Sequence, residues 1–111
     1  MELQAEQFND VLVIRAAQDR IDAACAIRFK DKMREMTQSS AQRVILDMSQ
    51  IAFIDSSGLG AIVAVMKAIG PDRKLELSGL THTVQKVFRL TRMDTIFQIH
   101  ERLPVGLAKA G

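Results

Sequence analysis

Short apolar runs along the chain predict the strands of the fold. Residues 11–16 are rich in β-branched side chains, which is typical of a strand. Leu3 and Phe8 indicate an edge strand before it, with a turn at Asn9-Asp10. The run 44–46 is apolar without interruption, as expected for a strand that is buried on both faces and pairs in parallel. Two more short strands are predicted, at 75–77 and 96–99.

Helical spacing of apolar residues predicts helices between these strands. One helix is expected over 23–36 with Asp22 as its cap, and a second begins after Asp55 and ends at Gly70-Pro71. The predicted apolar faces of three helices are Ala26, Phe29, Met33 and Met36; Leu59, Ile62, Val63, Met66 and Ile69; and Val84, Val87, Phe88 and Thr91. A last helix is expected over 103–110, with Pro104 in its first turn. Strands that alternate with helices in this way predict an α/β layer, in which helices pack on a mixed sheet.

Composition and charge narrow the class of protein. The chain has 111 residues, of which 48% are hydrophobic and 25% charged, so we expect a single domain over residues 1–111. The net charge is +2 and the basic residues form no run, which argues against a nucleic-acid partner. The single cysteine, Cys25, excludes an internal disulfide. Neither a signal peptide nor an apolar stretch of about 18 residues is seen, so we expect a cytoplasmic protein that does not insert into a membrane.

The segment from Val44 to Lys67 carries the most informative chemistry. A buried strand ends, D-S-S-G follows, and a helix begins at two serines. The first N–H groups of a helix have no intrahelical acceptors, and the helix dipole places about half a positive charge there. Asp55 or a serine at this point can simply cap the helix, and that interpretation stays open. The alternative is a regulated site, because a helix N-terminus can accept the roughly 1.5 to 2 negative charges of a phosphate on Ser56.

A partner protein would then meet the surface around the helix start. Gly58 and Gly60 offer no side-chain cover, which is expected to leave the serines open. The outer face of the helix is small and weakly polar, and consists of Gly60, Ala64, Lys67 and Ala68. Asp55 would repel a phosphate on its neighbour. We therefore expect phosphorylation to act mainly on a partner that packs against Ser56 and this face.

This segment resembles the phosphoserine region of STAS domains, and specifically of the stand-alone anti-sigma factor antagonists. The match rests on I-L-D-M-S-Q-I-A-F-I-D-S-S-G-L-G, with R-I-D-A-A at the place of the family's G-x-L-D segment. The stretch S-G-L-T-H-T-V-Q-K-V-F-R-L-T-R-M-D-T-I-F-Q-I-H is similar to the family's last strand, third helix and closing strand. The resemblance covers nearly the whole chain. It implies the STAS fold, with a single layer of helices packed on a mixed, mostly parallel sheet of four to five strands.

The resemblance also implies a partner-switching function. The family's phosphorylated serine corresponds to Ser56, with Ser57 as the second candidate, and two family aspartates near it correspond to Asp22 and Asp55. The unphosphorylated protein would bind an anti-sigma factor that is also a serine kinase of the Bergerat (GHKL) fold. Phosphorylation would release this partner, and a metal-dependent serine phosphatase would reset the cycle. The predicted partner-binding residues are Asp22, Asp55, Ser56, Ser57, Gly58, Gly60, Ala64 and Lys67.

One position departs from the family pattern. Asp19 stands where the family usually has glycine, three residues before Asp22. Aspartate adopts the backbone angles of glycine less easily, although it tolerates them better than most residues. Together with Arg20, it adds charge to a loop that the family places near the phosphoserine. The departure therefore bears on the identity of the partner more than on the fold.

Other functions have less support in the sequence. The family also includes scaffold subunits of membrane transport complexes, which is the main alternative, and a nucleotide-binding sensor is a third hypothesis. No P-loop, dinucleotide fingerprint or nucleophile elbow occurs, and Ser56 has no evident histidine base, so we expect neither an enzyme nor a cofactor. Cys25, His82 and His100 lack the spacing of metal ligands or catalytic pairs, so we expect ordinary structural or solvated positions for them.

Overall fold

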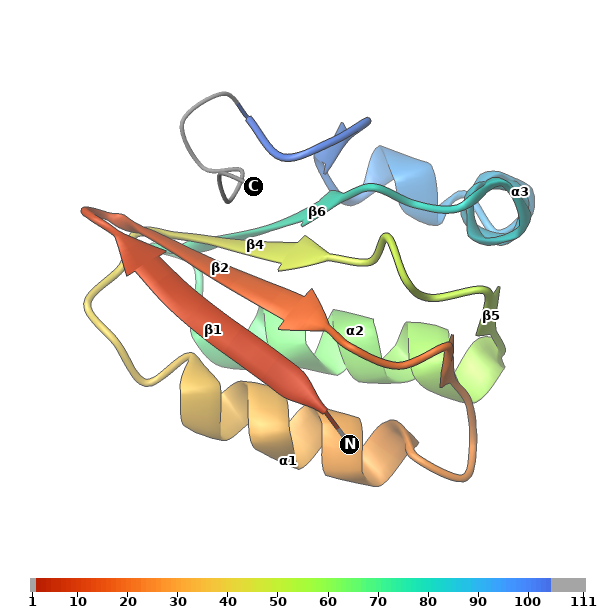
Figure 1. The fold of residues 1–111 in the computed structure, drawn as a ribbon, viewed down its shortest axis with the longest axis horizontal. Coiled ribbons are helices and arrows are strands. Elements are labelled where there is room, and N and C mark those ends of the chain that lie inside the picture. The colour runs from red at the N-terminus through yellow and green to blue at the C-terminus, as the bar shows by residue number, and fades with distance from the viewer. Residues whose placement is uncertain (1, 105–111) are drawn as a thin grey trace.

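The computed structural model describes residues 2–104 of the chain (Figure 1). The main sheet has five strands in the order β1-β2-β4-β6-β7, and a second sheet is formed by the short strands β3 and β5. The strands are β1 (Leu3–Phe8), β2 (Val11–Ala16), β3 (Arg20–Ile21), β4 (Arg43–Asp47), β5 (Phe53–Ile54), β6 (Lys74–Ser78) and β7 (Ile99–His100). The helices are α1 (Ala26–Met36), α2 (Ser56–Ile69), α3 (His82–Leu90) and the short 3-10 helix η1 (Met93–Thr95).

The main sheet is mixed and mostly parallel. β1 and β2 form an antiparallel hairpin, whereas β2, β4, β6 and β7 pair with one another in parallel. Asn9 takes a left-handed φ of 55° in the hairpin turn, a conformation that asparagine tolerates better than most residues. Val44, Ile45 and Leu46 of the central strand are fully buried, and this strand is paired with β2 on one side and β6 on the other. The predicted fold class is therefore confirmed.

Helices α1 and α2 lie side by side across one face of the main sheet (Figure 1). Phe29 and Met33 of α1 and Ile62 of α2 are fully buried in the core that these helices form with the sheet. Helix α3 lies at one end of the sheet, near β5. Its buried Phe88 packs against Phe97, with the ring centroids 6.3 Å apart and the rings tilted by 59°. The predicted layer of helices is thus made by α1 and α2, with α3 at its end.

The last part of the described chain differs from the prediction. A strand was expected over 96–99, but the chain forms η1 first, and β7 covers only Ile99–His100. Phe97 is buried beneath α3 while Ile96 is exposed, so these residues anchor a turn and do not extend the sheet. The helix predicted over 103–110 falls almost entirely outside the described residues, and residues 103–104 are not helical.

The short strands β3 and β5 bring two distant loops together. Arg20 pairs with Phe53, and Ile21 pairs with Ile54, in parallel register. The carbonyl oxygen of Asp19 accepts hydrogen bonds from the N–H groups that begin the second loop, Ala52 at 2.7 Å and Phe53 at 3.2 Å. Because β3 leads into the turn before α1 and β5 leads into D-S-S-G, this small sheet sets the spacing between the two segments.

An ionic cluster crosses three strands on the face of the sheet opposite α1 and α2. Leu75 and Leu77 belong to the core under the helices, so the alternation of a strand places Glu76 on the other face. The Glu76 carboxylate is 2% exposed and accepts from Arg43 Nε at 2.7 Å and Nη2 at 2.8 Å, while His100 Nε2 lies 2.7 Å from its Oε1. The hydrogen bonds from Arg43 are the main reason that the pKa of Glu76 is lowered, against the opposing effect of burial. The cluster ties β7 to β6 and β4.

Candidate functional site

Ser56 and Ser57 are the first two residues of α2, and both are exposed. The N–H groups of a first helical turn have no intrahelical acceptor. Within residues 2–104, nothing accepts a hydrogen bond from the backbone N–H of Ser56 or Ser57. The start of α2 therefore presents two hydroxyl groups beside free N–H donors, at the positive end of the helix dipole.

Asp55 holds this helix start in place. Its Oδ1 accepts from Gly58 N–H at 2.9 Å, which is the N-cap bond of α2. Its Oδ2 accepts from Ala23 N–H at 3.0 Å, across the gap to the turn before α1. Both oxygens of one carboxylate are thus used, and the two loops are tied together beside Ser56. The interpretation of Asp55 as a simple cap describes half of what the residue does.

Asp22 lies in the turn before α1, next to Ala23, but it does not cap α1 as predicted. Its Oδ1 accepts from Ala24 N–H at 3.1 Å, and its carbonyl oxygen accepts from the N–H groups of Cys25 and Ala26 at 3.1 and 2.8 Å. These bonds close a turn, and the helix begins only at Ala26, after Cys25. Asp22 therefore shapes the loop that faces Asp55, and its side chain is half-buried there.

The two glycines of α2 have different roles. Gly58 is buried, and a Cβ built on it would clash with the carbonyl oxygen of Ile21 and lie 2.8 Å from Ile54 Cγ1. It lets α2 approach β3 closely. The expectation that Gly58 leaves the serines open is therefore corrected, because Gly58 faces β3 and β5 and not the surface. Gly60 is exposed with no atom within 4 Å of a built Cβ, and does leave open space on the surface.

A groove runs between α1 and α2 next to the serines. Its volume is about 230 Å³, and it is lined by Ala26, Ile27, Lys30, Ser57, Gly60, Ala61 and Ala64. Ile27 is 69% exposed, although it is a large apolar residue. Neither Ile27 nor Lys30 was predicted to belong to the site, because both lie off the apolar face that identified the helix. The available signal was an isoleucine next to Arg28, off the apolar face of an amphipathic helix.

A second exposed feature lies on the small sheet that leads to the serines. Phe53 is 44% exposed, and the Arg20 guanidinium carbon lies 5.9 Å from its ring centroid. Arg20 also lies 3.4 Å from an Asp19 carboxylate oxygen and 3.9 Å from one of Asp22. Asp19 is not among the described residues with positive φ, so it fits here without the backbone freedom of glycine. The departure at Asp19 therefore changes surface charge and leaves the backbone unstrained.

Not all predicted site residues lie together. Ala64 is half-buried in the groove, whereas Lys67 is eleven residues beyond Ser56, about 16 Å along the helix axis. Lys67 lines a different cavity, at the far end of α2. Cys25 is a buried free thiol, His82 is exposed at the start of α3, and His100 belongs to the Glu76 cluster.

The described part of the chain shows neither a metal-binding cluster nor a membrane-spanning helix. Among residues 2–104, no group of three His, Cys, Asp or Glu side chains is placed to hold a metal ion. None of the described helices has the length and apolar character needed to span a membrane.

Comparisons with known proteins agree with this architecture. A family model described as STAS domain matches residues 2–104. The anti-sigma-B factor antagonist of Staphylococcus aureus (strain NCTC 8325 / PS 47) is 21% identical over 82 residues, which are 73% of this chain and 76% of that protein.

Solved structures extend the likeness to the fold. An anti-sigma factor antagonist from Mycobacterium paratuberculosis has a TM-score of 0.82 and 20% identity, covering 92% of this chain and 86% of that one. The Bacillus cell fate determinant SpoIIAA, solved in its phosphorylated form, has a TM-score of 0.60 and 21% identity, covering 88% of this chain and 90% of that one. At these identities the structural likeness shows the fold alone.

Proposed function

Because this chain belongs to the STAS domain family, we propose that it is an anti-sigma factor antagonist whose choice of partner is set by a phosphate on Ser56. In the proposed cycle, the unphosphorylated protein binds an anti-sigma factor that is also a serine kinase of the Bergerat (GHKL) fold. Phosphorylation of Ser56 releases this partner, and a metal-dependent serine phosphatase restores the hydroxyl group. The cycle would take place in the cytoplasm, where ATP is present.

The observation that carries the proposal is the exposed Ser56 at the first position of α2. Transfer of the γ-phosphoryl group of ATP would form an O–P bond at Ser56 Oγ, release ADP, and pass the hydroxyl proton to a base of the kinase. The product would carry about 1.5 to 2 negative charges at pH 7. The free N–H groups of Ser56 and Ser57 and the helix dipole can stabilise this charge locally. The modification is therefore compatible with the fold that is described here.

The effect of the phosphate would fall on the docked partner. Ser57 and Gly60 line the groove between α1 and α2, and the exposed Ile27 lies on its other wall. A partner that packs on this small, apolar surface would have to desolvate the dianion at Ser56, which is costly without a matching cation. The Asp55 carboxylate cannot rotate away, because it is bound to Gly58 and Ala23. Phosphate and partner therefore compete for one surface.

Phosphorylation of the purified chain tests the site assignment. With the Bergerat-fold serine kinase of the same organism and ATP, intact-mass spectrometry should show one added phosphate, and peptide mapping should place it on Ser56. Ser56→Ala should abolish the modification, whereas Ser57→Ala should retain most of it. Equal phosphorylation of wild type and Ser56→Ala would refute the assignment.

Binding to the kinase tests the switch itself. Ser56→Asp should weaken the complex at least tenfold in calorimetry, because a charge then lies inside the docking surface. Ser40→Asp is a matched control, since Ser40 is exposed in the loop between α1 and β4 and does not line the groove. Wild-type affinity of Ser56→Asp would contradict the switch and leave the scaffold role in a transport complex as the better account.

A further inference from the structure

Among the described residues, none pairs with half of the outer edge of β6. Strand β7 pairs with β6 only at Leu77 and Ser78, and Leu77 N–H donates to Gln98 O at 2.9 Å. On its other side β6 pairs with β4 over its whole length, and Lys74 N–H donates to Gln42 O. The backbone groups of a strand point alternately to the two sides, so those of Leu75 point to the same edge as those of Leu77. Within residues 2–104, nothing bonds to the N–H or C=O of Leu75 across this edge.

A cavity of about 540 Å³ lies along this open edge. It is bounded by the end of α2, the start of β6, and the segment between η1 and β7. Met66 and Ile96 give it apolar walls, and Ile96 is 49% exposed although it is a large hydrophobic residue. The volume is within the range of ordinary ligand pockets. In the described part of the chain, this edge therefore borders a cavity with apolar walls.

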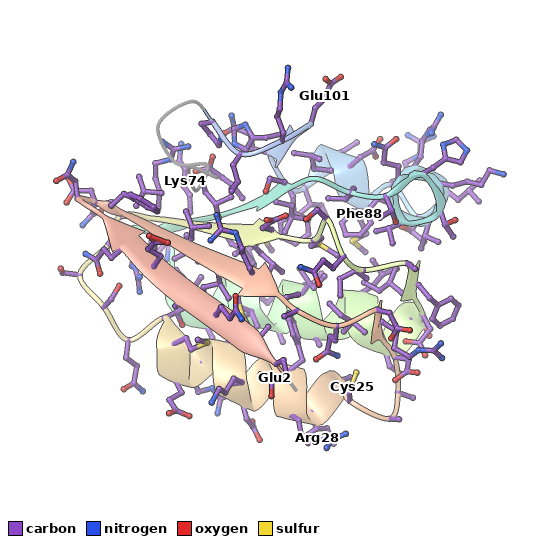
Figure 2. All side chains as sticks on the ribbon, viewed as in Figure 1. Glu2, Cys25, Arg28, Lys74, Phe88 and Glu101 are labelled. Atoms are coloured by element: carbon purple, nitrogen blue, oxygen red, sulfur yellow. The ribbon has the colours of Figure 1, made fainter. Side chains whose placement is uncertain are left out.

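The charge around this cavity is positive. Lys67, Arg73 and Lys74 line it, and none of them has a carboxylate at ion-pair distance among the described residues. Arg73 donates instead to the carbonyl oxygens of Ala41 and Thr37, at 2.6 and 2.8 Å, and its Nη2 is shielded from solvent without an acceptor. Glu76 also lines the cavity, but its charge is matched by Arg43. Figure 2 shows Lys74 toward the end of the sheet at which β6 begins, with Cys25 toward the opposite end.

We propose that the open edge of β6 binds a short, extended, acidic segment of a partner protein by strand addition. The segment's backbone would bond to Leu75 N–H and C=O, in line with β7. One of its apolar side chains would pack between Met66 and Ile96, and a carboxylate would lie near Lys67 and Lys74. Strand addition takes its affinity from main-chain hydrogen bonds and its specificity from pockets for alternate side chains. An unpaired sheet edge beside a cationic, apolar-walled cavity offers both.

This second site is separate from the phosphoserine surface. Helix α2 has 14 residues, which places its C-terminal end about 20 Å from Ser56. A partner held at β6 would stay bound whether or not Ser56 carries a phosphate. The two sites can therefore be tested independently, and a negative result for one proposal does not affect the other.

The test uses the unphosphorylated chain and a capped peptide of alternating glutamate and valine, six residues long. We expect amide chemical-shift changes centred on residues 73–76 and Ile96, and hydrogen exchange of the Leu75 amide slowed at least tenfold by saturating peptide. Lys74→Glu should weaken binding at least fivefold, and Lys86→Glu, on the exposed face of α3, should leave it unchanged. Circular dichroism and thermal unfolding of both variants verify that they are folded.

Three control ligands separate strand addition from other binding. A lysine-valine peptide should not bind, and an N-methylated glutamate-valine peptide should bind at least fivefold more weakly. N-acetylglutamate alone should not protect the Leu75 amide. The proposal is overturned if the basic peptide binds equally well, if N-acetylglutamate reproduces the shifts and protection, or if the Leu75 amide is already protected in the free chain.

Discussion

Around Ser56, single residues are fixed by contacts that lie far away in the sequence. Asp55 is bound to both Gly58 and Ala23, and Gly58 lies against the Ile21 carbonyl oxygen. Ser56 and Ser57 make no such contact with the described residues, so they are the positions in D-S-S-G that can change chemically at little cost to the fold. The two serines at the start of α2 could be located from the sequence, because a serine at a helix start is a local feature, whereas the choice of Ser56 over Ser57 rests on the family resemblance. The role of Gly58 depends on a contact between β3 and α2 that no local pattern records.

Gly58→Ala is expected to destabilise the fold strongly. The added Cβ would clash with the Ile21 carbonyl oxygen, so α2 would have to shift away from β3, at a cost of about 2–3 kcal/mol in the free energy of unfolding. Gly60→Ala is the matched control in the same helix, and should stabilise the fold by about 0.5–1 kcal/mol because its Cβ meets open space. Urea unfolding of the two variants measures both. Equal effects of the two substitutions would show that the close approach at Gly58 does not constrain the fold.

At the scale of elements, the pair α1–α2 forms the surface that we assign to the partner. The apolar faces of both helices follow from their spacing, and the structure places Phe29, Met33 and Ile62 in the core as expected. The outward side of α1 was not predictable in the same way, because hydrophobic periodicity identifies buried residues. Hydrophobic periodicity does not identify an exposed isoleucine on the polar side of a helix. Only the position of the neighbouring helix shows that Ile27 borders a groove.

Ile27→Glu is expected to weaken kinase binding at least tenfold while leaving the fold intact. Ile27 is 69% exposed and lies on the wall of the groove, so its replacement removes apolar contact and adds a charge where a partner would pack. Stability should change by no more than about 0.5 kcal/mol, since the side chain is outside the core. Leu90→Glu on α3, where Leu90 is 79% exposed, is the control for surface charge. Titration calorimetry measures the affinity of both variants for the kinase. Equal affinities of Ile27→Glu and Leu90→Glu would contradict the assignment of the groove as the docking surface.

At the scale of the molecule, the longer strands and the mixed sheet were predicted, whereas the order of the strands in the sheet and the shortest strands were not. The uninterrupted run 44–46 indicated a buried strand that pairs in parallel, and the alternation of strands and helices indicated the layer. The two-residue strands β3 and β5 exist because they pair with each other, and no two-residue pattern reveals such a pairing in advance. β7 is shortened because Phe97 turns inward to Phe88. Because β7 is short, no residue within 2–104 pairs with the first part of the outer edge of β6.

The Glu76 cluster joins β4, β6 and β7, so its charge should govern how the stability of the whole sheet depends on pH. The folded-state pKa of Glu76 is lowered from 4.5, chiefly by hydrogen bonds from Arg43. A lowered pKa stabilises the fold above the unfolded-state value, and this contribution is lost as pH falls through the folded-state value. Glu76→Gln should therefore lower the free energy of unfolding at pH 7 by about 1–3 kcal/mol. The difference in the free energy of unfolding from wild type should shrink as the pH is lowered from 5 to 3, measured by urea unfolding at each pH.

Glu35→Gln, at an exposed position of α1, is the control, and its free energy of unfolding should equal that of wild type at each pH. A gap between Glu76→Gln and wild type that stays constant between pH 7 and 3 would show that the carboxylate acts by shape and not by charge.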